Sequence, residues 1–144
     1  MHRVILFITA AILGFGFPEV PASVVAERDL EKRSELALKA ADDQISAAVK
    51  AYTDGAEPKV FEQHISTIEE LARLSMQSLQ DTGKQASKKP KYFKRAELKL
   101  RALLRRMATL SNDVSVDDRP RVEAAMKSMT EIHEKLLHDI MAKK

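Results

Sequence analysis

Two histidines near the carboxyl end of the chain, His133 and His138, come closest to a spacing that could bind a metal ion. In a zinc metalloprotease helix the two histidines stand at positions i and i+4, with a glutamate directly after the first. Glu134 fills the glutamate position here, but the second histidine stands at i+5, about 140° around a helix. The two rings therefore cannot bind one ion from the same face. The Glu-x-x-His pairs of di-iron bundles are also absent from the sequence.

No other set of side chains in the sequence predicts catalysis or a bound cofactor. The chain has no cysteine, which excludes disulfides, thiolate metal ligands and thiol nucleophiles. It has only four glycines, too few for a glycine-rich phosphate loop. The methionines recur at core spacing on the expected helices, where methionine ordinarily fills gaps. We therefore predict no catalytic residue, no metal ligand, no cofactor and no enzymatic activity.

His133 lies close to the centre of the apolar face expected for the last helix. A histidine in that position is most often a core or boundary residue with a satisfied hydrogen bond, and this is our prediction. The alternative is a protein that carries a metal or cofactor through His133, or that uses the ring as a pH-sensitive switch. His64 is expected at the edge of an apolar face, and His138 in solvent.

Positive charge is concentrated in one region, although the net charge of the chain is only +3. Residues 84–106 contain ten lysines and arginines and one acid, Glu97. On a helical projection, the basic residues from position 91 onward lie within an arc of about 160°, opposite the apolar seam, with Leu98 in the middle. The candidate binding residues are Lys88, Lys89, Lys91, Lys94, Arg95, Lys99, Arg101, Arg105 and Arg106.

A basic arc of this kind can hold an anionic partner through many weak contacts. The partners we expect are an anionic membrane surface, an envelope polymer or an acidic protein. Nucleic acid is disfavoured, because Tyr92 and Phe93 are the only nearby aromatic residues and base stacking needs exposed rings. The alternative is a solvated face, partly neutralised by acidic neighbours such as Glu69, Glu70 and Asp81.

Apolar residues spaced three and four apart predict four helices after the N-terminal segment. These helices span residues 27–53, 58–81, 91–110 and 118–141. Gly55 and Gly83 end the first two, since glycine tolerates the left-handed geometry of a helix end. The third helix is expected to stop at residues 111–113, and Asp117 or Asp118 to cap the fourth.

Two of these helices have distinctive apolar faces. The face of the first is thin and rich in alanine, so it should permit close approach of a neighbouring helix. Its residues are Leu30, Ala37, Leu38, Ala41, Ile45, Ala48, Val49 and Tyr52. The face of the third follows the heptad spacing of a packed helical seam. Its residues are Phe93, Ala96, Leu100, Leu103, Met107 and Leu110.

The sequence thus predicts one all-α domain, residues 27–144, folded as an antiparallel four-helix bundle with up-down-up-down topology. Short connections between helices of similar length favour antiparallel neighbours. Two rivals stay open, namely a pair of extended hairpins and a bundle completed by dimerisation. A further alternative is a structural homo-oligomer, in which the seam of the third helix packs between chains as in a coiled coil.

The first 26 residues have the organisation of a signal peptide. A short positive start at residues 1–3 precedes an apolar run at 4–17, which is 14 residues long. Spanning a bilayer takes about 20 residues, so an uncleaved anchor is the weaker alternative. Two small-residue patterns predict cleavage after Ala22 or after Ala26. We expect an exported protein, either periplasmic or extracellular.

Overall fold

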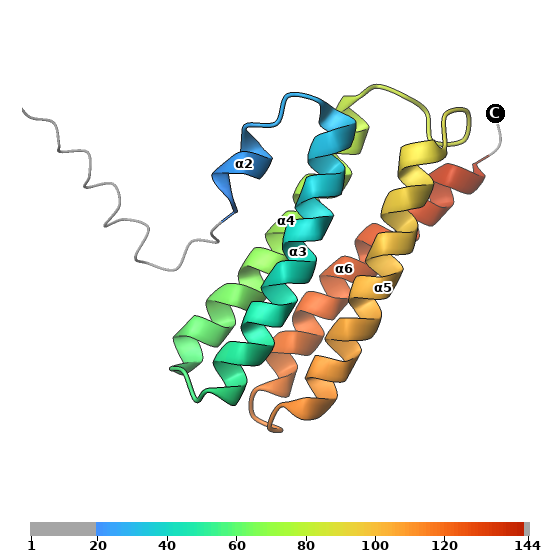
Figure 1. The fold of residues 1–144 in the computed structure, drawn as a ribbon. Helices are drawn as coiled ribbons and strands as arrows, with labels where there is room; N and C mark the ends of the chain where they lie inside the picture. Colours follow the sequence, from blue (N-terminus) through green and yellow to red (C-terminus); the bar gives the residue numbers. More distant parts are fainter. Residues whose placement is uncertain (1–19, 143–144) are drawn as a thin grey trace, which may run out of the picture.

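The computed structural model describes residues 20–142, and in this part of the chain every regular element is a helix (Figure 1). The elements are the short helix α2 (Ala22–Val25) and the long helices α3 (Leu30–Thr53), α4 (Pro58–Asp81), α5 (Lys91–Asp113) and α6 (Arg119–Met141). Most of the predicted signal peptide falls at residues 1–19, outside the described residues. None of the described helices is both long and apolar enough to cross a membrane.

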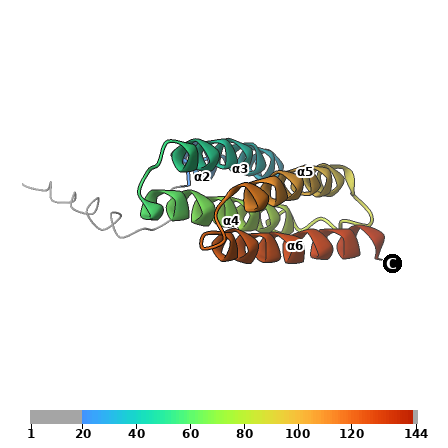
Figure 2. The same ribbon diagram turned by 90° about the horizontal axis from the view of Figure 1, so that it is seen from below.

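The four long helices form a bundle in which the chain direction alternates from each helix to the next, as predicted (Figure 1). Successive helices are neighbours in the pairs α3–α4 and α5–α6. The helices α4 and α5, however, face each other across a diagonal, so that α5 lies beside α3 and α6 lies beside α4 (Figure 2). The connection of nine residues, 82–90, can reach about 30 Å when extended, which is enough to cross the bundle.

The alanine-rich face of α3 packs closely against α4, as predicted. Ala37, Ala41 and Ala48 are completely buried, and α3–α4 is the most extensive contact between any two described helices. The prediction for Val49 is wrong, because its side chain is 41% exposed. Val49 lies one residue beyond Ala48, about 100° further around the helix, and so falls outside the contact with α4.

Helix α3 begins later than predicted, at Leu30 and not at residue 27. Asp29 is the N-cap residue, and its carboxylate accepts hydrogen bonds from the backbone N–H groups of Glu31 and Lys32, at 3.1 and 3.2 Å. An aspartate in this role satisfies N–H groups that have no partner inside the helix. The residues before it form a link to α2, whose Val24 is buried in the core.

Helix α5 continues to Asp113, three residues beyond the predicted end at Leu110. The guanidinium of Arg119 supports this extension, donating to the backbone carbonyl oxygens of Ser111 at 2.8 Å and Val114 at 3.1 Å. An arginine that binds the last carbonyl groups of a helix stabilises its end. Val114 is buried and adds the apolar contact.

The predicted cap of the last helix is wrong, although α6 begins at Arg119, within one residue of the predicted start. Asp118 occupies the N-cap position without making a capping hydrogen bond. Its carboxylate instead accepts from the hydroxyls of Tyr52 and Ser115, each at 3.0 Å. The helix ends at Gly55 and Gly83 agree with prediction, since both glycines have φ of 74° in the left-handed region.

Candidate anion-binding surface

The nine predicted cations lie on α5 and on the connection before it, and the structure divides them by what they contact. We call the nine together the basic surface. Arg95 and Arg106 face α3, where Arg95 pairs with Glu35 at 2.8 Å and Arg106 pairs with Asp42 at 2.7 Å. Arg106 also donates to the carbonyl oxygen of Asp42 and to the hydroxyl of Ser46. These two arginines therefore join α5 to α3.

Arg101 has a partner on its own helix. Its Nε donates to the carboxylate of Glu97 at 3.0 Å, one turn away on α5. The Glu97 side chain is only 7% exposed, so the lone acid of the basic region is buried. Three of the nine cations are thus held by carboxylates, and all three are arginines.

The acids that the alternative of a partly neutralised face named as neighbours have other partners. Glu69 binds Arg73 and Arg121, and Glu70 binds Arg73. Asp81 accepts from the Gln77 amide. All three acids belong to α4, which lies diagonally across the bundle from α5, so their place in the fold explains the error. The acids of the neighbouring helix α3 take this role instead.

Six of the nine cations form no salt bridge with any described residue. Lys88, Lys89, Lys94, Lys99 and Arg105 are exposed and have no acidic partner in residues 20–142. Lys91 is also exposed, and its ammonium lies 5.3 Å from the centre of the Tyr92 ring. Unpaired charge therefore remains on the connection and along α5.

Part of this charge forms a straight line on the helix. Residues spaced alternately three and four apart lie along one side of a helix. On α5 such a row stands opposite the buried seam, and we call it the outer ridge. Its residues are Lys91, Lys94, Leu98, Arg101 and Arg105. Leu98 is 57% exposed, so an apolar side chain projects from the middle of a row of cations, as predicted.

A groove of about 620 Å³ runs between α3 and α5 beside the outer ridge. Its lining is mixed in charge, with Asp42 and Asp43 on the α3 side and Arg95 and Lys99 on the α5 side. The positive potential of α5 is therefore weakened toward α3 and strongest on the ridge and at the start of the helix.

His133 is a boundary residue with a satisfied hydrogen bond, as predicted. Its Nε2 donates to the Glu97 carboxylate at 2.7 Å, and its side chain is 14% exposed. Burial raises the pKa of Glu97, but the hydrogen bonds from Arg101 and His133 outweigh burial and leave the pKa below its ordinary value. His64 contacts the Gln44 amide oxygen at 2.8 Å, and His138 is 83% exposed.

His133 belongs to no cluster of metal ligands in the part of the chain that the structure describes. No group of three or more His, Cys, Asp or Glu side chains within residues 20–142 is placed to hold a metal ion. The arrangement of α5 also argues against a seam between chains. Phe93, Leu100, Leu103, Met107 and Leu110 are each at most 3% exposed in the single chain, so the seam is already occupied by the other helices.

Sequence reasoning located the basic surface but missed the residues that organise it. Glu35 and Asp42 carry no signal in the sequence, because nothing there shows that α3 and α5 are neighbours. Glu97 does carry one, since it is a lone acid close to the apolar seam, where a charged group needs a partner. Comparison with protein-family models, with curated proteins and with solved structures found no match to this chain.

Proposed function

We propose that this protein is an exported, non-enzymatic binding protein whose basic surface attaches it to an anionic membrane surface. The observation that carries the proposal is the set of exposed cations without acidic partners, gathered on one helix and the connection before it. Unpaired cations keep their full attraction for an external anion, whereas the cations paired with α3 have lost part of it.

The shape of the outer ridge suits a flat partner. From Lys91 to Arg105 the ridge extends about 21 Å along a straight helix, so its cations can contact several lipid headgroups at once. Each lysine or arginine near an anionic leaflet contributes about 1 kcal/mol. Leu98 stands among these cations and can enter the boundary between headgroups and acyl chains.

The same features disfavour nucleic acid. Tyr92 is half-buried, and its ring is flanked by the Lys91 ammonium at 5.3 Å and the Arg95 guanidinium at 5.2 Å, so it is not free to stack on a base. Export is proposed from the N-terminal pattern of charge, apolar run and small residues. An exported protein would meet anionic lipid before nucleic acid.

The test is sedimentation with vesicles of phosphatidylglycerol or of phosphatidylcholine over a series of salt concentrations. The full chain is compared with a ridge variant carrying Lys94→Gln and Arg105→Gln on the outer ridge and Lys99→Gln beside it, which removes three unpaired cations and breaks no salt bridge among the described residues. A control variant carries Lys59→Gln, Lys127→Gln and Lys135→Gln, the same charge change on exposed lysines of α4 and α6. All three proteins share the N-terminal apolar run, so its contribution cancels.

We expect phosphatidylglycerol binding that weakens as salt rises and falls roughly 100- to 200-fold in the ridge variant, given about 1 kcal/mol for each of the three cations. The control variant should bind within a few-fold of the parent. Equal loss in both variants would mean that only net charge matters, and the basic surface would not be the site. Binding to an anionic polysaccharide or an acidic protein, but to no vesicle, would overturn the membrane as partner.

A further inference from the structure

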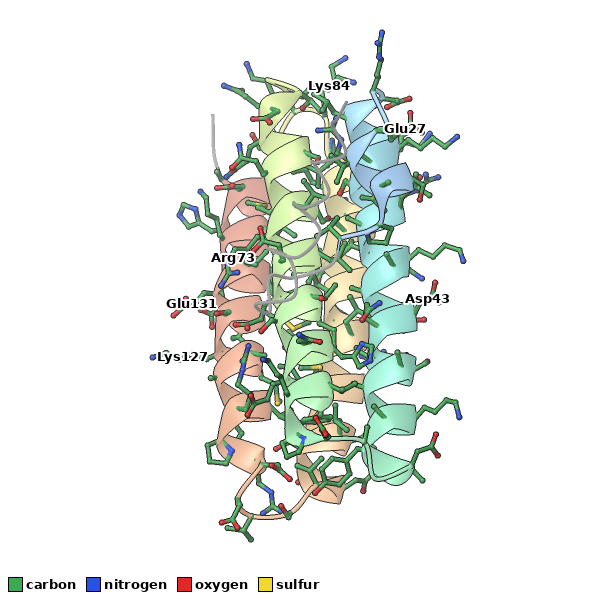
Figure 3. All side chains as sticks on the ribbon, turned by 90° about the vertical axis from the view of Figure 1, so that its left-hand side faces the viewer. Glu27, Asp43, Arg73, Lys84, Lys127 and Glu131 are labelled. Carbon is green, nitrogen blue, oxygen red and sulfur yellow. The ribbon has the colours of Figure 1, made fainter. Side chains whose placement is uncertain are left out.

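A pocket of about 340 Å³ lies at the start of α5, where this helix, the connection before it and the start of α3 meet. Figure 3 shows Lys84 at this end of the bundle, close to the level of Glu27 and far from Lys127. The charged and aromatic side chains that line the pocket are Glu31, Lys84, Lys88, Lys89, Lys91 and Tyr92.

The charge inside this pocket is unbalanced. Glu31 is the one carboxylate among the described residues that line it, and Lys84 already holds this carboxylate at 2.8 Å. The other three lysines have no acidic partner among the described residues. Three like charges around one small volume repel one another, and an anion that enters it relieves that repulsion. No side chain of residues 20–142 caps the N-terminus of α5, and the helix dipole adds a positive potential of the same sign.

We propose that this pocket binds a phosphate monoester dianion. The inference rests on the proposed function, since it names the group that the basic surface recognises first. A dianion with several acceptor oxygens can bind more than one ammonium, and each ammonium has three N–H donors that turn to meet it. A monoanionic phosphodiester has less charge to offer. The volume lies at the lower end of the range for small-molecule pockets, which suits a headgroup more than a polymer.

The first experiment is a titration of the full chain with inorganic phosphate at constant ionic strength, with chloride as the balancing anion and backbone amide chemical shifts as the readout. We expect a saturable response centred on residues 84–92. A pocket variant carrying Lys88→Gln, Lys89→Gln and Lys91→Gln should bind phosphate at least tenfold more weakly. The Lys59→Gln, Lys127→Gln, Lys135→Gln control should stay within twofold of the parent.

Two results would overturn the pocket. One is a response to phosphate no larger than the response to chloride. The other is a pocket variant that binds phosphate as well as the control variant does. All the substituted side chains are exposed, so an unchanged amide spectrum away from the pocket verifies that each variant is folded.

The second experiment distinguishes a lipid headgroup from a free phosphate compound as the ligand of the pocket. It also distinguishes failure of the pocket from failure of the proposed function. Vesicles of phosphatidic acid, a monoester, are compared with vesicles of phosphatidylglycerol, a diester, at equal surface potential. Preference for phosphatidic acid that disappears in the pocket variant identifies a lipid headgroup. Equal binding to both vesicles, with phosphate still saturating the pocket, identifies a free phosphate compound. Vesicle binding that needs the ridge cations, with no phosphate response, retains the proposed function and rejects the pocket.

Discussion

His133 on α6 donates a hydrogen bond from Nε2 to the Glu97 carboxylate on α5, at 2.7 Å. Both side chains are nearly out of contact with water, at 14% and 7% exposure. Arg101 binds the same carboxylate from the solvent side. One buried acid therefore links the α5–α6 contact inside the bundle to the outer ridge on its surface.

This linkage predicts a pH dependence of stability. The pKa of Glu97 is lowered in the folded protein, so its ionised form is favoured by folding. The resulting stabilisation is present above the ordinary glutamate pKa of 4.5 and is lost as the pH falls through the lower pKa of the folded state. In urea unfolding measured from pH 7 to pH 3, we expect the free energy of unfolding to decrease once the pH is lower than 4.5.

A Glu97→Gln variant tests the assignment. At pH 7 its free energy of unfolding should be about 1–3 kcal/mol lower than that of the parent, because Arg101 and His133 lose their carboxylate partner. It should also show a flatter decline in acid than the parent. A variant as stable as the parent at pH 7, or with the same acid slope, would contradict the role of this pair. Glu134→Gln, on the exposed side of α6, is the matched control.

Tyr52 predicts a second, separate contribution to stability. Its hydroxyl donates to Asp118 at 3.0 Å and accepts from the Ser115 N–H at 2.7 Å, which ties the end of α3 to the connection between α5 and α6. Tyr52→Phe keeps the ring beside Phe61 and removes both bonds. We expect a loss of about 1–2 kcal/mol in chemical unfolding.

The control for this variant is Tyr92→Phe, because the Tyr92 hydroxyl forms no hydrogen bond within residues 20–142. Its ring, which contacts Lys91 and Arg95, is retained. The control should unfold within about 0.5 kcal/mol of the parent. Similar losses in both variants would show that the hydrogen bonds of the Tyr52 hydroxyl do not account for the effect.

The alanine face of α3 predicts sensitivity to added volume. Ala41 is completely buried where α3 meets α4, so Ala41→Leu must push the two helices apart. Overpacking of this kind costs about 1–3 kcal/mol. Ala124→Leu, on the exposed side of α6, should cost less than about 0.5 kcal/mol. Thermal unfolding of the two variants compares them, and equal melting temperatures would contradict close packing at Ala41.

The sequence was sufficient to predict the helices and their buried faces, because periodicity reports which side of a helix avoids water. The helix predicted at residues 58–81 agrees with the structure at both ends, because Pro58 and Gly83 are local signals for a helix start and a helix end. Periodicity does not report which helices are neighbours. That choice depends on how residues 82–90 cross the bundle, and it decides that Arg95 and Arg106 meet acids of α3 and not those of α4.

The caps of two helices show the same limit at the scale of single residues. Asp29 and Asp118 both precede helices and have the same side chain, but only Asp29 caps. The carboxylate of Asp118 instead accepts a hydrogen bond from Tyr52, a residue 66 positions away in the chain. Local sequence rules state that aspartate is favoured at the start of a helix. They do not show that a hydroxyl distant in the chain can donate a competing hydrogen bond to the same carboxylate.

The burial of Val24 leads to a prediction about processing. If the chain is exported, as we propose, cleavage after Ala26 would remove α2 and uncover the part of the core that Val24 fills, at 3% exposure. Cleavage after Ala22 retains this contact, and burying a valine side chain is worth about 1.5 kcal/mol. We therefore expect the exported protein to begin at Ser23, as measured by intact mass and N-terminal sequencing. A chain beginning at Glu27 and as stable as one beginning at Ser23 would show that α2 is not part of the folded domain.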